Sequence, residues 1–209
     1  MSRLQVGDNY SLEVGEAGTY RLKIMNAVYG PSTEKLLEEI GLEGKRVLDV
    51  GCGTGNVSCW IARQVGETGS VVGVDVSEEQ TEIAKKNADA IGLKNISFKV
   101  GNAYETGVER ESFDIAYCRF VLCHLMQPEN ALREMLATLK TGGTLVCEDL
   151  DISGGFSDPP IEAFDKMNQS IQDVAKGRSV GFNIGRQLHR LFREAGLTDI
   201  KINIVQPAF

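Results

Sequence analysis

The sequence predicts a doubly wound α/β fold, in which a mostly parallel sheet carries helices on both of its faces. Short apolar segments rich in β-branched residues, such as 46–50 and 70–74, alternate with segments of helical periodicity, such as 56–65. Helices placed between strands imply βαβ units, whose strands run parallel and are buried on both faces. A length of 209 residues suffices for one such domain and hardly for two. We therefore expect residues 1–209 to form a single domain.

The N-terminal part of the chain, residues 1–44, is expected to form a helical cap. Leu36, Leu37 and Ile40 recur at helical spacing. A helix is expected to begin near Pro31, because proline is well tolerated in a first helical turn and serine and threonine follow it. A glycine after Ile40 marks its end.

Six strands are expected along the chain, because six short apolar segments are each bounded by turn signals. They cover residues 46–50, 70–74, 96–100, 113–117, 144–148 and 200–205. Helices are expected between them, at about 56–65, 78–91, 128–139, 159–177 and 185–195. Residues 149–184 form the one long insertion, and it follows the fifth strand at the carboxyl edge of the sheet. We expect this insertion to shape a pocket there.

Composition and charge exclude several classes of protein. The net charge is −7 and no long basic run is present, so we expect no nucleic-acid partner. No apolar stretch approaches the length of a membrane span, and the first residues contain no apolar signal core, so we expect no membrane association. The five cysteines form no C-x-x-C pair and mostly lie in apolar segments, which is typical of reduced core residues in a cytoplasmic protein. A thiol catalyst or a soft-metal site is the weaker alternative.

A glycine-rich turn follows the first strand and carries the strongest functional signal. The glycines are Gly51, Gly53 and Gly55, and Asp49 stands in front of them. Glycine tolerates positive φ and lets a ligand approach bare backbone, and ligands of open α/β sheets bind at the carboxyl ends of strands. The spacing differs from the G-x-G-x-x-G of dinucleotide folds, and a carboxylate beside the loop favours an ammonium or sulfonium group over a pyrophosphate. The turn therefore predicts a site for a small, nucleotide-like, positively charged ligand.

Two polar residues end the next strands. Asp75 follows strand 70–74, where a carboxylate can accept hydrogen bonds from both ribose hydroxyls of an adenosine. An aspartate that caps the next helix is the alternative, but Ser77 is better placed for that role. Asn102 follows strand 96–100, and its side-chain oxygen can accept a hydrogen bond from an adenine amino group. An asparagine in a tight turn is an equally good interpretation of Asn102.

These motifs resemble those of the class I S-adenosylmethionine-dependent methyltransferases. Asp49 and the turn Gly51-Cys52-Gly53-Thr54-Gly55 resemble the family's first motif, which holds the amino-acid end of the cofactor. Residues 119–125, the pattern Leu132-Arg133-Glu134 and residues 139–145 resemble its small-molecule branch, which includes quinone and natural-product methyltransferases. The resemblance implies a Rossmann-like methyltransferase fold with S-adenosylmethionine as cofactor. The cofactor-binding residues that it implies are Asp49, Gly51, Cys52, Gly53, Gly55, Asp75, Val76, Gln80, Asn102, Ala103 and Arg119.

The resemblance spans about residues 36–205 and departs from the family pattern in three places. Asn102 stands where aspartate is usual, which keeps a hydrogen-bond acceptor and drops the charge, and Thr141 replaces a usual proline. The family sheet has seven strands with the last one antiparallel, whereas this sequence stops at Phe209, so we expect that final antiparallel strand to be absent. Either the sequence is part of a longer natural protein, or an unpaired strand edge remains. An unpaired edge favours pairing with another chain, so a homodimer is one expectation.

Methyl transfer is an in-line displacement that needs alignment and exclusion of water more than a nucleophile. His124 is the candidate catalytic base, because a neutral imidazole can take a substrate proton near pH 7. It lies among Val121, Leu122 and Leu125, where a packed and hydrogen-bonded histidine is the commoner outcome.

Three acids, Glu148, Asp149 and Asp151, cluster after the fifth strand and could ligate Mg²⁺ as in catechol-type methyltransferases. Those enzymes also need an acid after the fourth strand, where this chain has Arg119. Rim acids or loop caps are therefore the better interpretation, and we expect no metal.

The expected function is transfer of a methyl group from S-adenosylmethionine to a small-molecule acceptor. An NAD-dependent oxidoreductase and a non-catalytic S-adenosylmethionine-binding protein are the alternatives. The acceptor is expected to be selected by the segment around Tyr20-Arg21-Leu22 and by residues 149–184. Aromatic residues that could form an apolar lid there, or simply belong to the core, are Tyr10, Tyr20, Phe156, Phe164 and Phe182.

Overall fold

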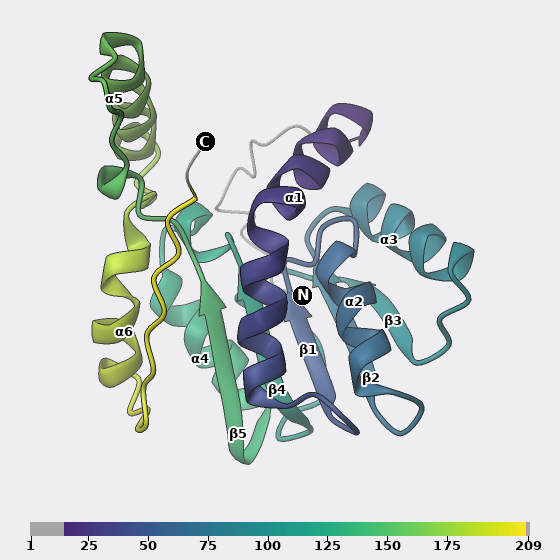
Figure 1. Ribbon diagram of the computed structural model, residues 1–209. Coiled ribbons are helices and arrows are strands. Elements are labelled where there is room, and N and C mark those ends of the chain that lie inside the picture. The colour runs from purple at the N-terminus through teal and green to yellow at the C-terminus, as the bar shows by residue number, and fades with distance from the viewer. Residues whose placement is uncertain (1–14, 208–209) are drawn as a thin grey trace, which may run out of the picture.

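The computed structural model describes residues 15–207, which form a five-stranded sheet with helices on both faces (Figure 1). All strand pairs are parallel, and the strand order is β3-β2-β1-β4-β5. The strands are β1 (Arg46–Val50), β2 (Ser70–Asp75), β3 (Ile96–Val100), β4 (Phe113–Arg119) and β5 (Leu139–Glu148). This confirms the doubly wound parallel fold. The strand order reverses beside β1, which creates a crevice at its carboxyl end.

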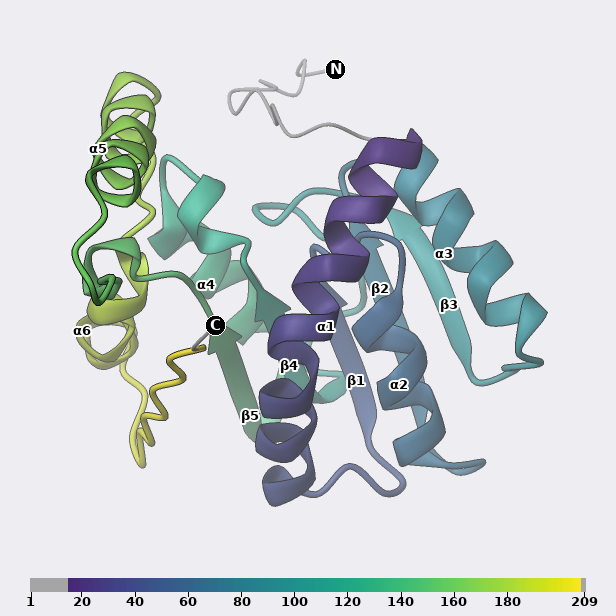
Figure 2. The same cartoon turned by 45° about the horizontal axis from the view of Figure 1, so that its top comes forward.

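The helices form a layer on each side of the sheet (Figures 1 and 2). They are α1 (Gly15–Ile40), α2 (Asn56–Val65), α3 (Glu78–Ala90), α4 (Pro128–Thr138), α5 (Glu162–Gly177) and α6 (Leu188–Glu194). Short 3₁₀ helices are η1 (Leu122–His124), η2 (Ile152–Gly154) and η3 (Ile184–Gln187). Helices α1 and α2 lie over one face, whereas α4 lies over the other. Helix α5 extends beyond the carboxyl edge of the sheet.

Successive residues of β1 pack into two separate hydrophobic cores, one on each face of the sheet. Val47 packs with Leu37 of α1 and Ile61 of α2 on one face. Leu48 packs with Met135 of α4 on the other face. Side chains alternate between the faces of a strand, so a strand covered on both faces must be apolar throughout. Each such side chain contributes about 1.5–3 kcal/mol when fully buried, and the two cores therefore hold the crevice rigidly in place.

The first helix differs from the prediction, because it begins at Gly15 and runs through Pro31 without a break. A proline inside a helix removes one hydrogen bond, and here the carbonyl of Ala27 loses its partner. Both Ala27 and Pro31 are exposed, so water can solvate that carbonyl. The extension matters for function, because it carries the N-terminal half of α1 above the carboxyl edge of the sheet.

The predicted sixth strand at residues 200–205 is wrong. This segment has no regular secondary structure, and Ile202, Ile204 and Val205 are exposed. A β-branched pattern becomes a strand only when its backbone pairs with a strand edge, and this segment pairs with none of the described strands, although the outer edge of β5 is open. Helix α5 begins at Glu162 instead of residue 159, and the predicted last helix is divided between η3 and α6. No helix within residues 15–207 is long and apolar enough to cross a lipid bilayer.

Candidate functional site

The glycine-rich loop lies at the carboxyl end of β1, between β2 and β4, and backbone hydrogen bonds hold it against β2. The N–H groups of Gly51 and Cys52 both donate to the carbonyl of Val74, at 2.7 and 3.1 Å. The N–H of Gly55 donates to the carbonyl of Cys52 at 3.0 Å, which closes the turn before α2 begins. The loop is therefore a fixed element of the crevice.

Two of its glycines cannot be replaced by larger residues. Gly51 has φ +73°, and a Cβ there would stand 2.3 Å from Cγ2 of Val121 in the segment after β4. Gly55 has φ +78°, and its Cβ would stand 3.0 Å from both Ala84 and Phe98. L residues rarely adopt such positive φ values, so both conformation and space require glycine here. The close approach at Val121 also shows that the segment after β4 packs against the loop.

Asp49 lies beneath the loop and is almost completely buried. Its carboxylate accepts a hydrogen bond from Oγ of Ser58 at 2.5 Å. Burial raises the pKa of Asp49 to about 6, against the lowering influence of the Ser58 hydrogen bond and of the Arg119 charge. A buried carboxylate of this kind is stabilised in its charged form by a cationic ligand. The sequence analysis missed Ser58, which could have been identified as a polar residue on the otherwise apolar face of α2.

Asp75 ends β2 and joins the loop to the start of α3. One carboxylate oxygen accepts a hydrogen bond from the N–H of Gly53 at 2.8 Å, and the other accepts one from the N–H of Ser77 at 2.9 Å. Burial raises the pKa of Asp75, although these backbone hydrogen bonds act in the opposite direction. Ser77 caps α3 by accepting from the N–H of Gln80 at 3.3 Å, as expected. Val76, the next residue after Asp75, is exposed at the crevice.

Gln80 presents an unpartnered amide to the glycine-rich loop. The side chain is 2% exposed, and neither Oε1 nor Nε2 has a hydrogen-bond partner within the described part of the chain. Its Oε1 lies 3.0 Å from the position that a Cβ on Gly53 would take, and Leu22 of α1 approaches the same position to 3.1 Å. A buried amide without a partner is costly, so this group indicates a polar ligand beside Gly53.

Asn102 and Ala103 lie in the loop after β3. The N–H of Gly101 donates to the carbonyl of Asp75 at 2.9 Å, which brings this loop beside the crevice. The side-chain oxygen of Asn102 accepts hydrogen bonds from the N–H groups of Tyr104 and Glu105, at 2.8 and 2.9 Å. The structure thus shows the turn-forming role of this oxygen, and Ala103 packs at the margin of the core.

Arg119 ends β4 and ties α1 to the sheet. Its Nη1 donates to Oγ1 of Thr33 at 3.0 Å, and its Nη2 donates to Oδ1 of Asn26 at 2.9 Å. The Thr33 hydroxyl donates to Glu148, which also accepts a hydrogen bond from Tyr117 at 2.6 Å. The positive charge of Arg119 also lowers the pKa of Asp49. The hydrogen bonds that Arg119 makes with described residues, however, go to α1.

His124 lies in η1, and its ring meets the ring of Phe182 edge to face, with the centroids 5.4 Å apart. Burial, and to a smaller extent the charges of Arg21 and Arg178, lower the pKa of His124 to about 4. The imidazole is therefore neutral at pH 7. Arg21 belongs to the segment of α1 that the sequence analysis assigned to acceptor selection, and Arg178 follows α5.

The three acids at the end of β5 each have a partner of their own. Glu148 holds Tyr117 and Thr33, as described above. Asp149 accepts from the N–H groups of Cys123 and Leu150, at 3.2 and 2.8 Å, so it caps a loop. Asp151 forms a two-point ion pair with Arg186. Within residues 15–207 no three His, Cys, Asp or Glu side chains form a group that could hold a metal ion.

Four of the five aromatic residues suggested for a lid belong to the described residues, and of these Phe164 is half-buried beside Gly155. Tyr10 lies outside the described residues. Tyr20 and Phe156 are 68% and 77% exposed, whereas Phe182 packs against His124 and the core.

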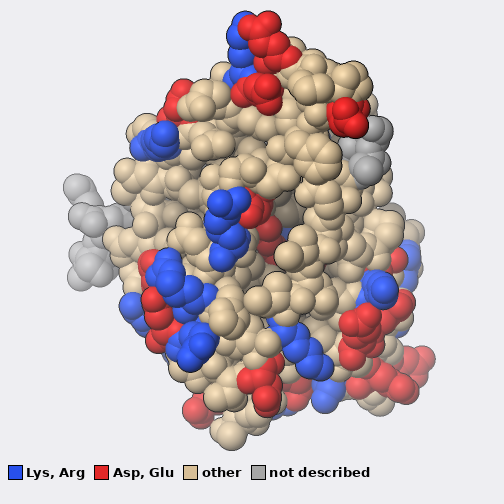
Figure 3. All heavy atoms as spheres, turned by 60° about the vertical axis from the view of Figure 1, so that its left-hand side comes forward, with Lys and Arg blue, Asp and Glu red and all other residues tan. Residues whose placement is uncertain are grey.

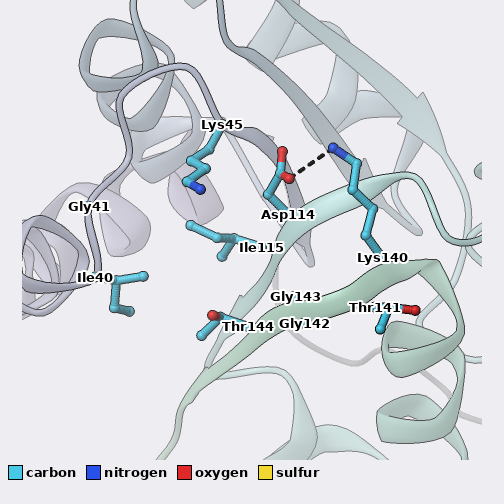
Figure 4. A pocket seen from close by; sticks show the side chains of 10 residues that line it. All are labelled: Ile40, Gly41, Lys45, Asp114, Ile115, Lys140, Thr141, Gly142, Gly143 and Thr144. Carbon is cyan, nitrogen blue, oxygen red and sulfur yellow. Dashed lines mark hydrogen bonds and ion pairs between the residues drawn. The ribbon is translucent and has the colours of Figure 1, made fainter.

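A cavity of about 140 Å³ lies at the opposite, amino edge of the sheet (Figure 4). It is lined by the end of α1 and the starts of β4 and β5, and its one ion pair in the figure joins Lys140 to Asp114 at 2.8 Å. Ligands of open parallel sheets bind at the carboxyl ends of the strands, so this cavity is not the functional site.

Comparisons with known proteins agree with the geometry. The model of a family described as "Methyltransferase domain" matches residues 42–196. A methyltransferase named GfsG from Streptomyces halstedii is 34% identical over 60% of this chain and 45% of its own length. A demethylmenaquinone methyltransferase from Bacillus cereus is 36% identical over 50% of this chain and 44% of its own length. The chain thus spans less than half of each of these two relatives.

One relative matches over a larger share of both chains. A demethylmenaquinone methyltransferase from Staphylococcus aureus strain JH9 is 27% identical over 81% of this chain and 75% of its own. Among solved structures, a SAM-dependent methyltransferase from Aquifex aeolicus has a TM-score of 0.61 and 26% identity, and the match covers 78% of both chains. Together with the parallel sheet and the glycine-rich loop beside Asp49, these findings show that the chain belongs to the methyltransferase domain family and has the fold of the S-adenosylmethionine-dependent methyltransferases.

Proposed function

We propose that this protein transfers a methyl group from S-adenosylmethionine to a small-molecule acceptor. The observation that carries the proposal is the buried carboxylate of Asp49 beneath a bare glycine loop, with the unpartnered amide of Gln80 beside it. A positively charged amino acid group next to Asp49 stabilises the charged carboxylate, and polar atoms near Gly53 give the Gln80 amide its hydrogen bonds.

The residues present fit the other parts of the cofactor. Asp75 would bind the ribose hydroxyls, because each carboxylate oxygen accepts one hydrogen bond, from the N–H of Gly53 or of Ser77, and can accept another. Val76 would cover one face of the adenine. Asn102 would act indirectly, since its oxygen already accepts two backbone hydrogen bonds and so holds the loop that carries Ala103. Arg119 would support the site by holding α1 in place.

When bound, S-adenosylmethionine supplies a methyl group that its sulfonium centre has already activated. The residues of this chain would then bind the acceptor, align it and exclude water. We propose that residues 1–44 and 149–184 select the acceptor, because α1 and the 149–184 segment both lie at the carboxyl edge of the sheet. His124, neutral and buried between them, is the candidate base for an acceptor proton, and its pKa of about 4 restricts that role to an acidic acceptor group.

The acceptor class, the cellular location and the assembly belong to the same proposal. Relatives named as demethylmenaquinone methyltransferases support a small organic acceptor. The face in Figure 3 carries basic and acidic side chains in intermingled clusters and is hollowed near its centre, which suits a small molecule better than a nucleic acid.

All five cysteines are free thiols, which supports a reducing, cytoplasmic environment. The outer edge of β5 has no neighbouring strand among residues 15–207, which supports a homodimer.

Calorimetry with S-adenosylhomocysteine and with NAD tests the cofactor assignment. We expect binding of S-adenosylhomocysteine and none of NAD; the reverse would favour an NAD-dependent oxidoreductase. A screen of small-molecule acceptors with release of S-adenosylhomocysteine as readout then tests catalysis. Cofactor binding without turnover of any acceptor would favour the third candidate, a non-catalytic S-adenosylmethionine-binding protein.

A further inference from the structure

Arg21 of α1 carries one edge of its guanidinium without a partner. Its Nε and Nη2 are inaccessible to solvent, and neither has a hydrogen-bond partner within the described part of the chain. Arg21 also takes part in none of the ion pairs formed between described residues. A desolvated guanidinium is costly unless an anion pairs with it, so this edge indicates an anionic ligand.

The same edge of an arginine binds a carboxylate elsewhere in this protein. Arg186 donates from Nε to one oxygen of Asp151 at 2.8 Å and from Nη2 to the other at 2.7 Å. Nε and Nη2 of a guanidinium match the two oxygens of a carboxylate in a planar, two-point contact. Arg21 therefore presents the donors that Arg186 uses, in a buried place where the contact is stronger than at the surface.

The position of Arg21 joins the cofactor loop to the candidate base. Leu22, the next residue, packs over Gly53. The charge of Arg21 also acts on His124, together with that of Arg178. The neighbouring elements are η1 and the chain between α5 and η3, where Phe182 contacts His124 and the N–H of Gly181 donates to Cys123. An anion bound by Arg21 thus lies between the glycine-rich loop and the 149–184 segment.

We propose that Arg21 binds a carboxylate of the methyl acceptor through its Nε and Nη2 edge, so that the acceptor is an organic acid held beside His124. This inference rests on the proposed function and narrows its substrate class. The methionine carboxylate of the cofactor has the same chemistry and is the competing source. The acceptor is favoured, because Arg21 acts on His124 and Phe182 adjoins it, both in the segments assigned to acceptor selection.

Direct binding tests this inference without a known acceptor. The protein is saturated with S-adenosylhomocysteine and titrated calorimetrically with a panel of aromatic and aliphatic carboxylic acids, each paired with its primary amide. We expect at least one acid to bind at least tenfold more tightly than its amide, and Arg21→Gln to abolish that preference. Lys23→Gln is the matched control, because it removes an exposed positive charge from the same helix two residues away and should preserve the preference. Arg21→Lys should restore only part of it, since an ammonium lacks the two-point contact.

Three outcomes would overturn the inference, and they differ from failure of the proposed function. An absence of acid preference across the panel, or a preference that Arg21→Gln leaves intact, excludes an acceptor carboxylate at Arg21. A tenfold loss of S-adenosylhomocysteine affinity in Arg21→Gln, with unchanged affinity for methylthioadenosine, assigns Arg21 to the cofactor carboxylate instead. Failure of the wild type to bind S-adenosylhomocysteine would count against the proposed function itself. A thermal melt of each variant confirms that it is folded.

Discussion

Two regions lie at the same edge of the sheet but are built differently. One is the corner formed by the glycine-rich loop with Asp49, Asp75 and Gln80, and the other is the 149–184 segment. In the corner, Asp49, Asp75 and Gln80 are all at least 94% buried and lie next to β1 and β2. In the other segment, α5 buries only Ala175, and Phe156 is 77% exposed. The corner is therefore fixed by the two hydrophobic cores, whereas the segment has few contacts that constrain its sequence. A methyltransferase can keep one cofactor and change its acceptor when the two sites are supported so unequally.

Replacement of Gly51 by alanine should have the largest effect, because it places a Cβ 2.3 Å from Val121 at a φ of +73°. We expect a loss of about 3–4 kcal/mol in the free energy of unfolding, from overpacking and backbone strain together, and at least a 30-fold loss of cofactor affinity. Gly92→Ala is the matched control, since Gly92 has the same φ of +73° but open space around it, and should cost about 1 kcal/mol. Urea denaturation and calorimetry measure both. Equal losses in the two variants would show that the corner is not sterically fixed.

Removal of the Asp75 carboxylate should have the next largest effect. Asp75→Ala leaves the N–H groups of Gly53 and Ser77 without their acceptor and should cost about 2–3 kcal/mol of stability. Cofactor affinity should fall 10- to 100-fold in calorimetry. Asp75→Asn keeps one acceptor oxygen and should lose less of both. Unchanged affinity in Asp75→Ala would remove the ribose assignment.

Replacement of Asp49 should change cofactor affinity and the free energy of unfolding in opposite directions. Its pKa of about 6 in the folded protein lies above its ordinary value of 3.8, so the folded state keeps a proton that the unfolded chain has released. Stability from this residue is therefore present below pH 4 and is lost as the pH rises through 6. Asp49→Asn should raise the free energy of unfolding at pH 7 by about 1–2 kcal/mol and weaken cofactor binding at least tenfold.

The pH dependence of binding gives a second measurement of Asp49. Cofactor affinity of the wild type should decline as the pH falls below about 6, because protonation removes the charge that we propose faces the cofactor. The affinity of Asp49→Asn should stay flat over the same range. A variant that is both less stable and equally able to bind would contradict this role.

Substitutions in the 149–184 segment should have the smallest effect on the fold. Phe156→Ser and Val174→Ser replace exposed side chains, so the free energy of unfolding should change by less than about 0.5 kcal/mol. Cofactor affinity should stay within twofold, whereas the KM for an acceptor, once one is known, should change. Loss of cofactor affinity in either variant would show that the two regions are not separately supported.

The sequence predicted most of the corner, because its determinants are local. An apolar strand, a glycine turn and an acid at the end of each of two strands are contiguous patterns that need no knowledge of the tertiary structure. The parallel sheet followed from the same alternation. The role of the Asn102 oxygen could not be decided in this way, because a turn and an adenine contact place the same residue at the same position.

Features that depend on distant partners were harder to predict. The segment 200–205 has the composition of a strand, but no strand edge pairs with it among the described residues. Helix α1 continues through Pro31 because solvent replaces the lost hydrogen bond, which no local pattern indicates. The site proposed at Arg21 could not be predicted from the sequence, because it combines residues of α1, η1 and the end of α5, which are far apart in the chain.

Helix α1 links the two ligands energetically. Leu22 covers the cofactor loop, Arg21 faces the proposed acceptor site, and both lie on the helix that Arg119 anchors through Asn26. A shift of the helix that improves one contact must move the other, so the two binding equilibria are coupled. Thermodynamic linkage makes such coupling reciprocal: whatever factor the cofactor adds to acceptor affinity, the acceptor adds to cofactor affinity. Under the two proposals, a single helix would favour the ternary complex over either binary complex.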